Sequence, residues 1–506
     1  MTQTRIVAVL GATGYIGGRL VPALLEKGWR VRAIGRNTDK LRCRPFASDP
    51  GVELAQADVL DRPTLMAALR GCSAAFYLVH SMFPGVKDFE DQDRRAALTM
   101  RDAAQDAELG RIIYLGGLGD EDPNLSAHLK SRREVGEILG SGPVPLTWLR
   151  AAMILGSGSA SFEILRYLVE RLPIMITPAW VKSLCQPIAV TNVIDYLVGC
   201  LDQPATIGRT LDIGGPDILS YRDLFDIHAR VAGLRRRVII PVPVLTPRLS
   251  AHWIQLVTPV PATLAKPLAE GLRNTVVCRD NAIRDLIPTR LLTAEEAIAR
   301  ALDRTAHHAV ETSWTDAGMP RVPEWIACGD APYAGGTILE SAHAMTVAAP
   351  VAQVWDIVTS LGGDQGWLHW NWLWRLRGFL DKIVGGAGLR RGRRHPRQLR
   401  VGDALDFWRV LGVEERQRLV LLAEMKTPGE ALLRFDLREP SPGQTEITLR
   451  ARFRPRGLWG IVYWYILAPV HAPLFRGMLT AMARHTGATA VIPPHTPAKE
   501  APQCRL

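Results

Sequence analysis

Hydrophobic positions in the first 330 residues follow two alternating patterns. Runs such as Val7–Leu10 are apolar at every position, which is typical of a strand buried on both faces of a parallel sheet. Over residues 15–27, apolar side chains recur every fourth position, as in an amphipathic helix: Ile16, Leu20 and Leu24. Because strands and helices alternate in this way to about Pro243, residues 1–330 are predicted to form an α/β Rossmann domain with a doubly wound parallel sheet.

The pattern changes after a segment rich in glycine at residues 331–336. The expected order is then a short strand at 337–344, a helix at 350–358, several strands between 403 and 453, and a long apolar helix from about 458 to 484. This order predicts a second domain of the α+β class over residues 331–488. The proline-rich residues 489–506 are expected to be a disordered tail, and the proline-rich segment from 241 to 267 an irregular cap on the substrate side of the first domain.

Three glycines follow the first apolar run at intervals of three residues. Gly11 permits a tight turn, Gly14 lets the backbone approach a pyrophosphate, and Gly17 lets the next helix pack closely on the strand. A helix N-terminus at this point supplies N–H groups and a positive dipole end for phosphate. The loop is therefore a predicted dinucleotide site, with these residues: Gly11, Ala12, Thr13, Gly14, Tyr15, Ile16 and Gly17.

The end of the second predicted strand indicates which dinucleotide binds. An acidic residue there would accept hydrogen bonds from a ribose 2′-hydroxyl and favour NAD, whereas an arginine accommodates the 2′-phosphate of NADP. This chain has Arg36 followed by Asn37, with no acidic residue before Asp39. NADP(H) is the expected cofactor and NAD the less favoured one, with an ordinary solvated arginine as the alternative.

These motifs resemble the atypical and extended short-chain dehydrogenase/reductase superfamily, in particular its NmrA-like branch. The resemblance rests on residues 11–17, 57–61, 74–80, 114–118, 186–190 and 211–216, in the expected order. It implies that Asp58, after the third strand, bonds the adenine, although a turn aspartate is the alternative. It also assigns Val59, Val79 and His80 to the cofactor site.

The chain departs from the superfamily where catalysis is expected. A serine usually ends the fifth strand, but this chain has Gly116 and Gly117 there. The usual Tyr-x-x-x-Lys pair is replaced by His128 and Arg132. Histidine can act as an acid or base near neutral pH, whereas arginine cannot be deprotonated. His128 and Arg132 are therefore candidate catalytic residues, and a structural or ribose-side role is the alternative.

The second domain resembles the helix-grip fold (START-like, SRPBCC), in which an antiparallel sheet wraps a long helix around an apolar cavity. The motif at Ala349–Asp356 is typical of its first helix. The pairing with an NmrA-like domain is similar to the bacterial YbjT-like family of two-domain NAD(P)-binding proteins. This resemblance implies a hydrophobic small molecule as a candidate partner of the second domain.

Three features of this domain each have two readings. The tryptophans at 367, 370, 372 and 374 fit core packing or the lining of a cavity, and His369 has no second ligand at metal spacing, so no metal is expected. Six arginines within Leu389–Arg400 fit a solvated loop, or contact with an anionic membrane surface, an acidic partner or cofactor phosphates. The uncharged stretch Gly457–Phe475 fits a core helix, an interfacial helix or a membrane span.

Charge and cysteine content narrow the function classes. The chain has a net charge of +11, and residues 331–506 hold 23 basic and 14 acidic side chains, so most of the excess lies in the second domain. No nucleic-acid-binding module accompanies it, so no nucleic acid partner is expected. Seven scattered cysteines without a Cys-x-x-Cys pair, and an N-terminus that enters the first strand at once, indicate a cytoplasmic protein, with the periphery of the inner membrane as an alternative.

Together these patterns predict an NADP(H)-binding, reductase-like protein that transfers hydride to a hydrophobic carbonyl or quinone-like compound. The absence of the usual serine, tyrosine and lysine supports an alternative, a non-catalytic NADP(H)-binding scaffold or redox sensor. A third reading makes the second domain a carrier of hydrophobic ligands at the membrane surface.

Overall fold

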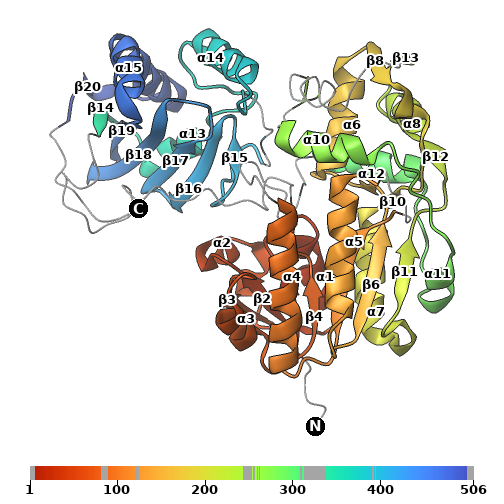
Figure 1. Ribbon diagram of the computed structural model, residues 1–506. Helices are drawn as coiled ribbons and strands as arrows, with labels where there is room; N and C mark the ends of the chain where they lie inside the picture. The colour runs from red at the N-terminus through yellow and green to blue at the C-terminus, as the bar shows by residue number, and fades with distance from the viewer. Residues whose placement is uncertain are drawn as a thin grey trace. The chain divides into compact units, whose positions relative to one another are not determined.

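A computed structural model describes residues 6–80, 89–119, 125–242, 262–307, 338–389 and 395–497, with a few single positions between these ranges. The chain divides into two compact units, Met1–Gly318 and Met319–Leu506 (Figure 1). The boundary expected near residue 330 and most of the expected proline-rich cap lie outside the described residues.

Unit 1 is built on a parallel sheet of seven strands, which confirms the predicted Rossmann fold. In spatial order the strands are β11 (Thr210–Ile213), β6 (Leu146–Ala151), β5 (Ile112–Gly117), β4 (Cys72–Tyr77), β1 (Ile6–Leu10), β2 (Arg30–Gly35) and β3 (Val52–Gln56). The order reverses between β1 and β4, and ligands of such sheets bind at the carboxyl ends of the strands beside this switch point.

Helices cover both faces of this sheet because its strands are apolar on both sides. In β1, Val7 and Val9 face one core and Ala8 and Leu10 face another. The first core is closed by α1 (Gly17–Glu26) and α7 (Val190–Asp202), and the second by α3 (Arg62–Leu69), α4 (Phe89–Asp106) and α5 (Ala127–Gly140). The continuous apolar runs in the sequence are thus explained by burial on two faces.

Smaller elements surround the carboxyl end of the sheet. The helices here are α2 (Thr38–Arg42), α6 (Ala160–Arg171), α8 (Tyr221–Val231), α10 (Ala262–Gly271), α11 (Ala282–Leu286) and α12 (Ala294–Ala306). Short strand pairs are β7 (Ile154–Leu155) with β10 (Ile188–Ala189), β9 (Leu184–Cys185) with β12 (Leu219–Ser220), and β8 (Ile174–Pro178) with β13 (Val238–Val242). Helices α6, α8 and α12 and the short strands form a separate apolar cluster beyond the main sheet. Leu41 of α2 and Ile283 of α11 belong instead to a core of the main sheet.

Unit 2 is an antiparallel sheet of seven strands on which a long helix packs. The strand order is β15 (Ala404–Leu405), β16 (Trp408–Glu414), β17 (Arg418–Ala423), β18 (Gly429–Ser441), β19 (Gln444–Pro455), β14 (Leu339–Val347) and β20 (Ala490–His495). Its helices are α13 (Val351–Ser360), α14 (Asn371–Ile383) and α15 (Gly457–Thr486). The predicted α+β class with a long C-terminal helix is confirmed.

The expectation of a disordered tail from residue 489 is wrong for residues 490–495, which form β20. This strand pairs with β14 in the antiparallel sense. The apolar residues Ala490, Val491 and Ile492 precede two prolines, and an edge strand tolerates proline because one side of it needs no ladder hydrogen bonds. The tail beyond residue 497 lies outside the described residues.

Helix α15 is the one helix in the described ranges that could cross a membrane, judged by length and composition alone. Its second half contributes Leu474, Phe475, Met478 and Leu479 to the core of unit 2. Yet only 22% of the residues in its most apolar stretch are buried. The expected core helix at Gly457–Phe475 therefore accounts for the buried side of α15 and does not account for its exposed apolar side.

Candidate functional site

The loop between β1 and α1 has a backbone that only glycine fits at two positions. Gly11 has a φ of +82°, and a Cβ atom there would lie 2.8 Å from the carbonyl oxygen of Leu78. A Cβ at Gly17 would overlap the carbonyl group of Gly11. The N–H of Gly14 donates to the Gly11 carbonyl oxygen at 2.8 Å, which closes the turn. The strand, turn and helix thus have the spacing that a pyrophosphate cradle requires.

The other predicted cofactor residues follow neighbouring strands of the same sheet edge. Arg36 follows β2 and is exposed, and Val79 and His80 follow β4. Directly after β4, the N–H of Leu78 donates to the carbonyl oxygen of Leu10 at 3.2 Å. Val59 follows β3 and is partly buried. The carboxyl ends of β4, β1, β2 and β3 are adjacent, so all these positions share one side of the sheet.

Two of these residues have local structural roles. The side chain of Asn37 accepts from the Lys40 N–H at 2.8 Å and caps α2. One carboxylate oxygen of Asp58 accepts from the Leu60 N–H at 3.0 Å and forms a turn. The turn reading of Asp58 therefore has a contact to support it, and the second carboxylate oxygen leaves the adenine reading open.

Arg44 is a residue that the sequence patterns missed. Its side chain is buried, and its Nη2 donates to the carbonyl oxygen of Thr13 at 2.9 Å. It precedes the short 3₁₀ helix η1 (Pro45–Ser48), which contacts β3. No local pattern predicts this contact, because it depends on the chain after α2 folding back onto the glycine loop.

A second group of polar side chains lies where catalysis is expected. The rings of His80 and His128 stack with centroids 5.5 Å apart and planes at 18°. Arg132, one turn after His128 on α5, is buried and forms an ion pair with Asp93 of α4. Ser131 Oγ also donates to Asp93, at 3.0 Å, and the hydroxyl of Tyr114 donates to the Arg132 carbonyl at 2.9 Å. We call His80, Asp93, His128 and Arg132 the His/Arg cluster.

Burial and the fixed charge of Arg132 set the protonation of the His/Arg cluster. Burial first, and Arg132 second, lower the pKa of His128 to about 3. The same two causes, together with His128, hold the pKa of His80 well below its usual value. Burial also raises the pKa of Tyr114 to about 12. Both imidazoles are therefore neutral at neutral pH, so His128 can offer a neutral N–H but is rarely an imidazolium.

Packing explains why no serine stands at the end of β5. A Cβ at Gly116 would lie 2.6 Å from Trp148 Nε1, and one at Gly117 would lie 2.9 Å from Leu129. The space that a side chain would need is filled by neighbouring residues. The serine hydroxyl of the superfamily is thus missing here, and neighbouring side chains leave no space for it.

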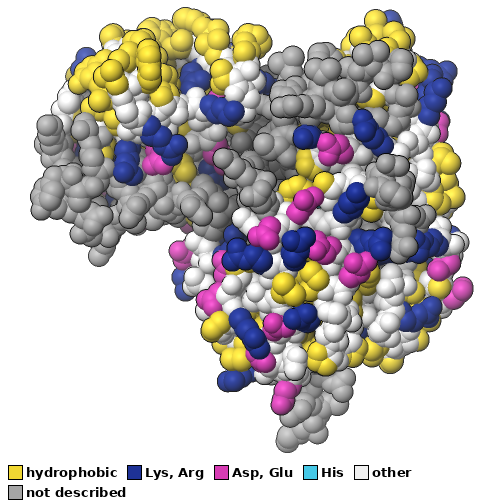
Figure 2. All heavy atoms as spheres, viewed as in Figure 1, with side chains coloured by type: hydrophobic (Ala, Val, Ile, Leu, Met, Phe, Trp, Pro, Cys, Tyr) yellow, Lys and Arg dark blue, Asp and Glu magenta, His cyan; other side chains and the backbone are white. Residues whose placement is uncertain are grey.

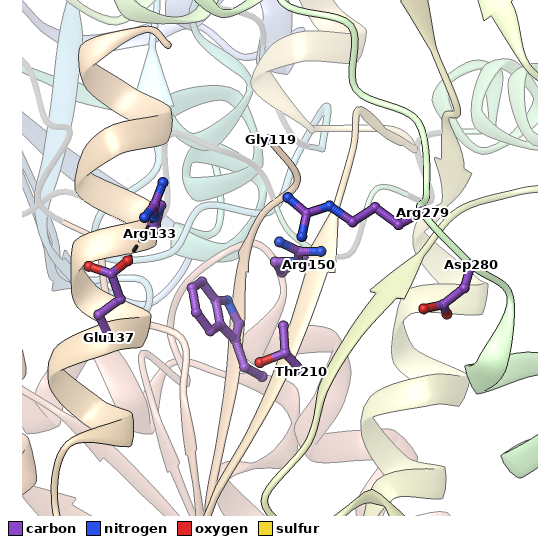
Figure 3. Close-up of a pocket in the computed structure, with 8 residues that line it drawn as sticks. Gly119, Arg133, Glu137, Arg150, Thr210, Arg279 and Asp280 are labelled. Carbon is purple, nitrogen blue, oxygen red and sulfur yellow. Dashed lines mark hydrogen bonds and ion pairs between the residues drawn. The ribbon is translucent and has the colours of Figure 1, made fainter. Parts of the chain in front are cut away.

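A pocket of about 350 Å³ opens elsewhere in unit 1 (Figure 3). Two of its cations are paired, Arg133 with Glu137 at 2.7 Å and Arg150 with Asp212 at 2.5 Å. None of the predicted site residues lines it. The lining residues are Gly119, Arg133, Glu137, Trp148, Arg150, Thr210, Arg279 and Asp280. These mostly polar walls do not suit a hydrophobic substrate.

In unit 2 the tryptophan cluster divides between the core and the surface. Trp367 and Trp374 are buried and stack at 5.0 Å, and Trp367 Nε1 donates to Asp406 at 2.9 Å. Trp370 and Trp372 are exposed. Within the described ranges, no group of three or more His, Cys, Asp or Glu side chains could hold a metal ion.

The arginine-rich loop is described only in part. Arg390, Arg391 and Arg394 lie outside the described residues. Arg393 donates to the carbonyl oxygens of Thr359 and Leu361, at the end of α13. This arginine therefore caps the C-terminus of α13, which ties its guanidinium to the backbone of unit 2.

Comparison with known families agrees with this division of the chain. A model of the NmrA-like family matches residues 3–247. A second model, described as a protein of unknown function (DUF2867), matches residues 333–478. The helix-grip assignment of unit 2 stays a prediction.

Two curated relatives match parts of the chain. A divinyl chlorophyllide a 8-vinyl-reductase of Zea mays is 28% identical over 222 residues, which is 42% of this chain and 55% of that protein. Subunit 9 of the NADH dehydrogenase [ubiquinone] 1 alpha subcomplex of Arabidopsis thaliana is 24% identical over 302 residues, 56% of this chain and 75% of that protein. The chain thus spans about half of the first relative.

Solved structures are similar to part of the chain. One is an NADPH-dependent quinone oxidoreductase of Escherichia coli complexed with NADPH. It is 18% identical, with a TM-score of 0.48, and the match covers 58% of this chain and 99% of that one.

Proposed function

We propose that unit 1 binds NADP(H) at the Gly11–Gly17 loop. The observation that carries this proposal is the close approach of Gly17 to Gly11, which leaves no room for a side chain between strand and helix. Such a cradle fits a pyrophosphate at the N-terminus of α1. Arg36 would bond the 2′-phosphate, and Arg44 would hold the loop through Thr13.

Removing the Arg36 charge tests the choice of cofactor. Charge-assisted hydrogen bonds contribute about 1.5–3 kcal/mol, so Arg36→Ala should weaken NADPH binding roughly tenfold or more and leave NADH binding unchanged. Fluorescence titration with both dinucleotides measures this. Arg300→Ala, which removes another exposed arginine, is the matched control. Equal weakening of both dinucleotides, or a wild-type preference for NADH, would contradict the assignment.

We further propose that the bound cofactor reduces a hydrophobic carbonyl or quinone-like compound. The reduced nicotinamide supplies the hydride, and the substrate oxygen must gain a proton. His128 is the candidate partner of that oxygen: its Nδ1 is buried and has no hydrogen-bond partner within the described residues. As a neutral imidazole, His128 would donate a hydrogen bond to the oxygen, and the proton would ultimately come from solvent.

Substitution of His128 tests this role. His128→Ala should abolish NADPH oxidation with a panel of quinones and aldehydes, while NADPH affinity changes by no more than a few-fold. Steady-state oxidation at 340 nm and equilibrium titration give the two readouts. Unchanged turnover in the variant would assign the group a structural role.

A non-catalytic NADP(H)-binding scaffold or sensor is the second candidate function. The observation that favours it concerns Arg132, which stands where the superfamily has its catalytic lysine. The charge of Arg132 is paired with the buried carboxylate of Asp93. Under this alternative the wild type binds NADPH and oxidises none of it across the same panel. Tight NADPH binding without NADPH oxidation would therefore support the scaffold function and contradict the reductase function.

The proposed hydrophobic ligand of unit 2 has a separate test. Aromatic side chains such as Trp367, Phe407 and Phe435 fill the interior between the sheet and its helices, so a ligand would have to displace or join them. Mass spectrometry of organic extracts from the purified protein would detect a retained apolar molecule. Empty extracts from protein purified without detergent would count against a carrier.

A further inference from the structure

Helix α14 turns an apolar face outward. Its buried residues are Trp374, Gly378 and Asp381. On the opposite side, large apolar side chains recur at intervals of three and four residues, which places them on one stripe of the helix. They are exposed by 45% to 63%: Trp372, Leu376, Phe379, Leu380 and Ile383. The usual arrangement of a soluble helix is thus inverted.

The first half of α15 has a second outward apolar face. No charged residue occurs between Arg456 and Arg476. The large apolar side chains here are exposed by up to 78%: Leu458, Trp459, Ile461, Val462, Tyr465 and Ile466. With Trp370 and Val384, the two helices hold more than half of the exposed large hydrophobic side chains of the described chain. Figure 2 shows hydrophobic side chains gathered over both helices, along the upper edge of unit 2.

Contacts within unit 2 tie the two helices to the sheet. A Cβ at Gly460 would overlap the carbonyl oxygen of Pro428, and the ring of Trp464 stacks on Phe453 at 5.7 Å. The imidazole of His369, just before α14, lies directly on Gly477 of α15. Because α15 is held along one side, it cannot cross a bilayer without leaving its sheet. Its free side can lie on a surface.

The charges beside these faces are positive. Arg375 and Arg377 flank the α14 stripe and have no acidic partner within the described residues, and Lys382 lies on the same helix. The single carboxylate of α14, Asp381, is buried and accepts from the N–H groups of Gly388 and Lys426, at 2.8 and 2.7 Å. Helix α15 has no acidic residue at all.

From these observations we propose that α14 and the first half of α15 form a docking face for an anionic bilayer surface. Tryptophan and tyrosine favour the boundary between headgroups and acyl chains, and arginines beside an apolar stripe reach the phosphate groups. A second copy of the chain fits less well, because a two-fold interface would bring the arginines of both copies together. The docking face adds α14 to the interfacial-helix alternative of Gly457–Phe475, since the sequence patterns gave residues 375–383 no assignment.

Flotation of the full-length protein with vesicles tests the docking face. We expect binding to vesicles of phosphatidylcholine with 30% phosphatidylglycerol at low salt, and much weaker binding to phosphatidylcholine alone or at high salt. Phe379→Ser with Ile383→Ser should reduce the binding at least tenfold. Ile174→Ser with Ile240→Ser removes exposed apolar groups from β8 and β13 and should have no effect. Thermal unfolding shows that each variant is folded.

The charges and aromatic groups have their own variants. Each basic side chain near an anionic surface contributes an attraction that corresponds to about a fivefold change in binding, so Arg375→Gln with Arg377→Gln should weaken it by about tenfold or more. Arg273→Gln with Arg300→Gln, in unit 1, is the charge-matched control. Brominated lipids should quench tryptophan emission less in Trp372→Phe with Trp459→Phe than in the wild type.

Several results would overturn the proposal. One is a lack of binding to anionic vesicles at low salt, and another is binding that the α14 variants leave unchanged. Resistance of the bound protein to alkaline extraction would indicate a span. A dimer in solution that dissociates in Phe379→Ser with Ile383→Ser would assign the face to a second copy.

Discussion

The glycine loop and the His/Arg cluster lie in the same unit but are built in different ways. The loop is made by backbone that approaches backbone, as at Gly11 and Gly17 within a few residues of each other. The cluster depends on Asp93 of α4 meeting Arg132 of α5, and on the partial burial of both histidines beside Arg132. A cofactor site can therefore be retained by short-range geometry while the neighbouring catalytic chemistry changes through distant partners.

Of the changes that test this comparison, loss of Asp93 should lower the free energy of unfolding most. Asp93→Ala leaves Arg132 as a buried charge without its carboxylate, which should cost about 3–5 kcal/mol in the free energy of unfolding. Urea denaturation measures it. Asp39→Ala breaks an exposed pair with Arg42 at 2.9 Å and should cost less than about 1 kcal/mol. If both variants lose equal stability, the cluster is not held by its buried pair.

The second test concerns the loop. Gly17→Ala forces the backbone of Gly11 to move, because the added Cβ overlaps it, and this overpacking should cost about 2–3 kcal/mol and weaken NADPH binding. Gly28→Ala is the control: its φ is +79°, but nothing lies within 4 Å of the added atom. Backbone strain alone should then cost about 1–2 kcal/mol and leave NADPH affinity unchanged. An equal loss of affinity in both variants would contradict the close-packing argument.

Acidification should have the smallest of the three effects. The pKa of His128 is about 3 in the folded protein and about 6.5 in the unfolded chain, so between these values the unfolded chain binds a proton that the folded protein does not. The free energy of unfolding therefore falls as the pH drops below about 6.5, by up to about 2 kcal/mol at pH 5. His128→Gln should lose this part of the pH dependence. Denaturant titrations of the wild type and the variant at pH 7.5 and 5 measure this. An equal fall in the free energy of unfolding in both proteins would show that the imidazole of His128 is not responsible.

The sequence predicts the loop well and the cluster poorly for the same physical reason. Strand, turn and helix at residues 6–26 are set by local hydrophobic spacing and glycine, and the structure has them where expected. The resemblance to the superfamily points to His128 and Arg132, but the pairing of Arg132 depends on Asp93, which is 35 residues away from His128 in the chain. Arg44 was missed because its contact with Thr13 is tertiary.

In unit 2 the sequence pattern is ambiguous in one place. The tryptophans of residues 367–374 can share a face of either a helix or a strand, so the pattern does not predict α14. The bounds of α13 and α15 are close to the expected ones. An amphipathic pattern gives the two faces of a helix but does not say which one is turned inward. In α14 the polar Asp381 lies inside, where backbone N–H groups satisfy it, and Phe379 lies outside.

The position of β14 has a consequence for synthesis of the protein. This strand is the first described one of unit 2, yet its two neighbours in the sheet are the last, β19 and β20. A ribosome that adds about 5–20 residues per second needs roughly 5–20 s to pass from residue 347 to residue 444. During that time β14 has no partner strand, so among the described strands of unit 2 residues 339–347 wait longest for a neighbour in the sheet.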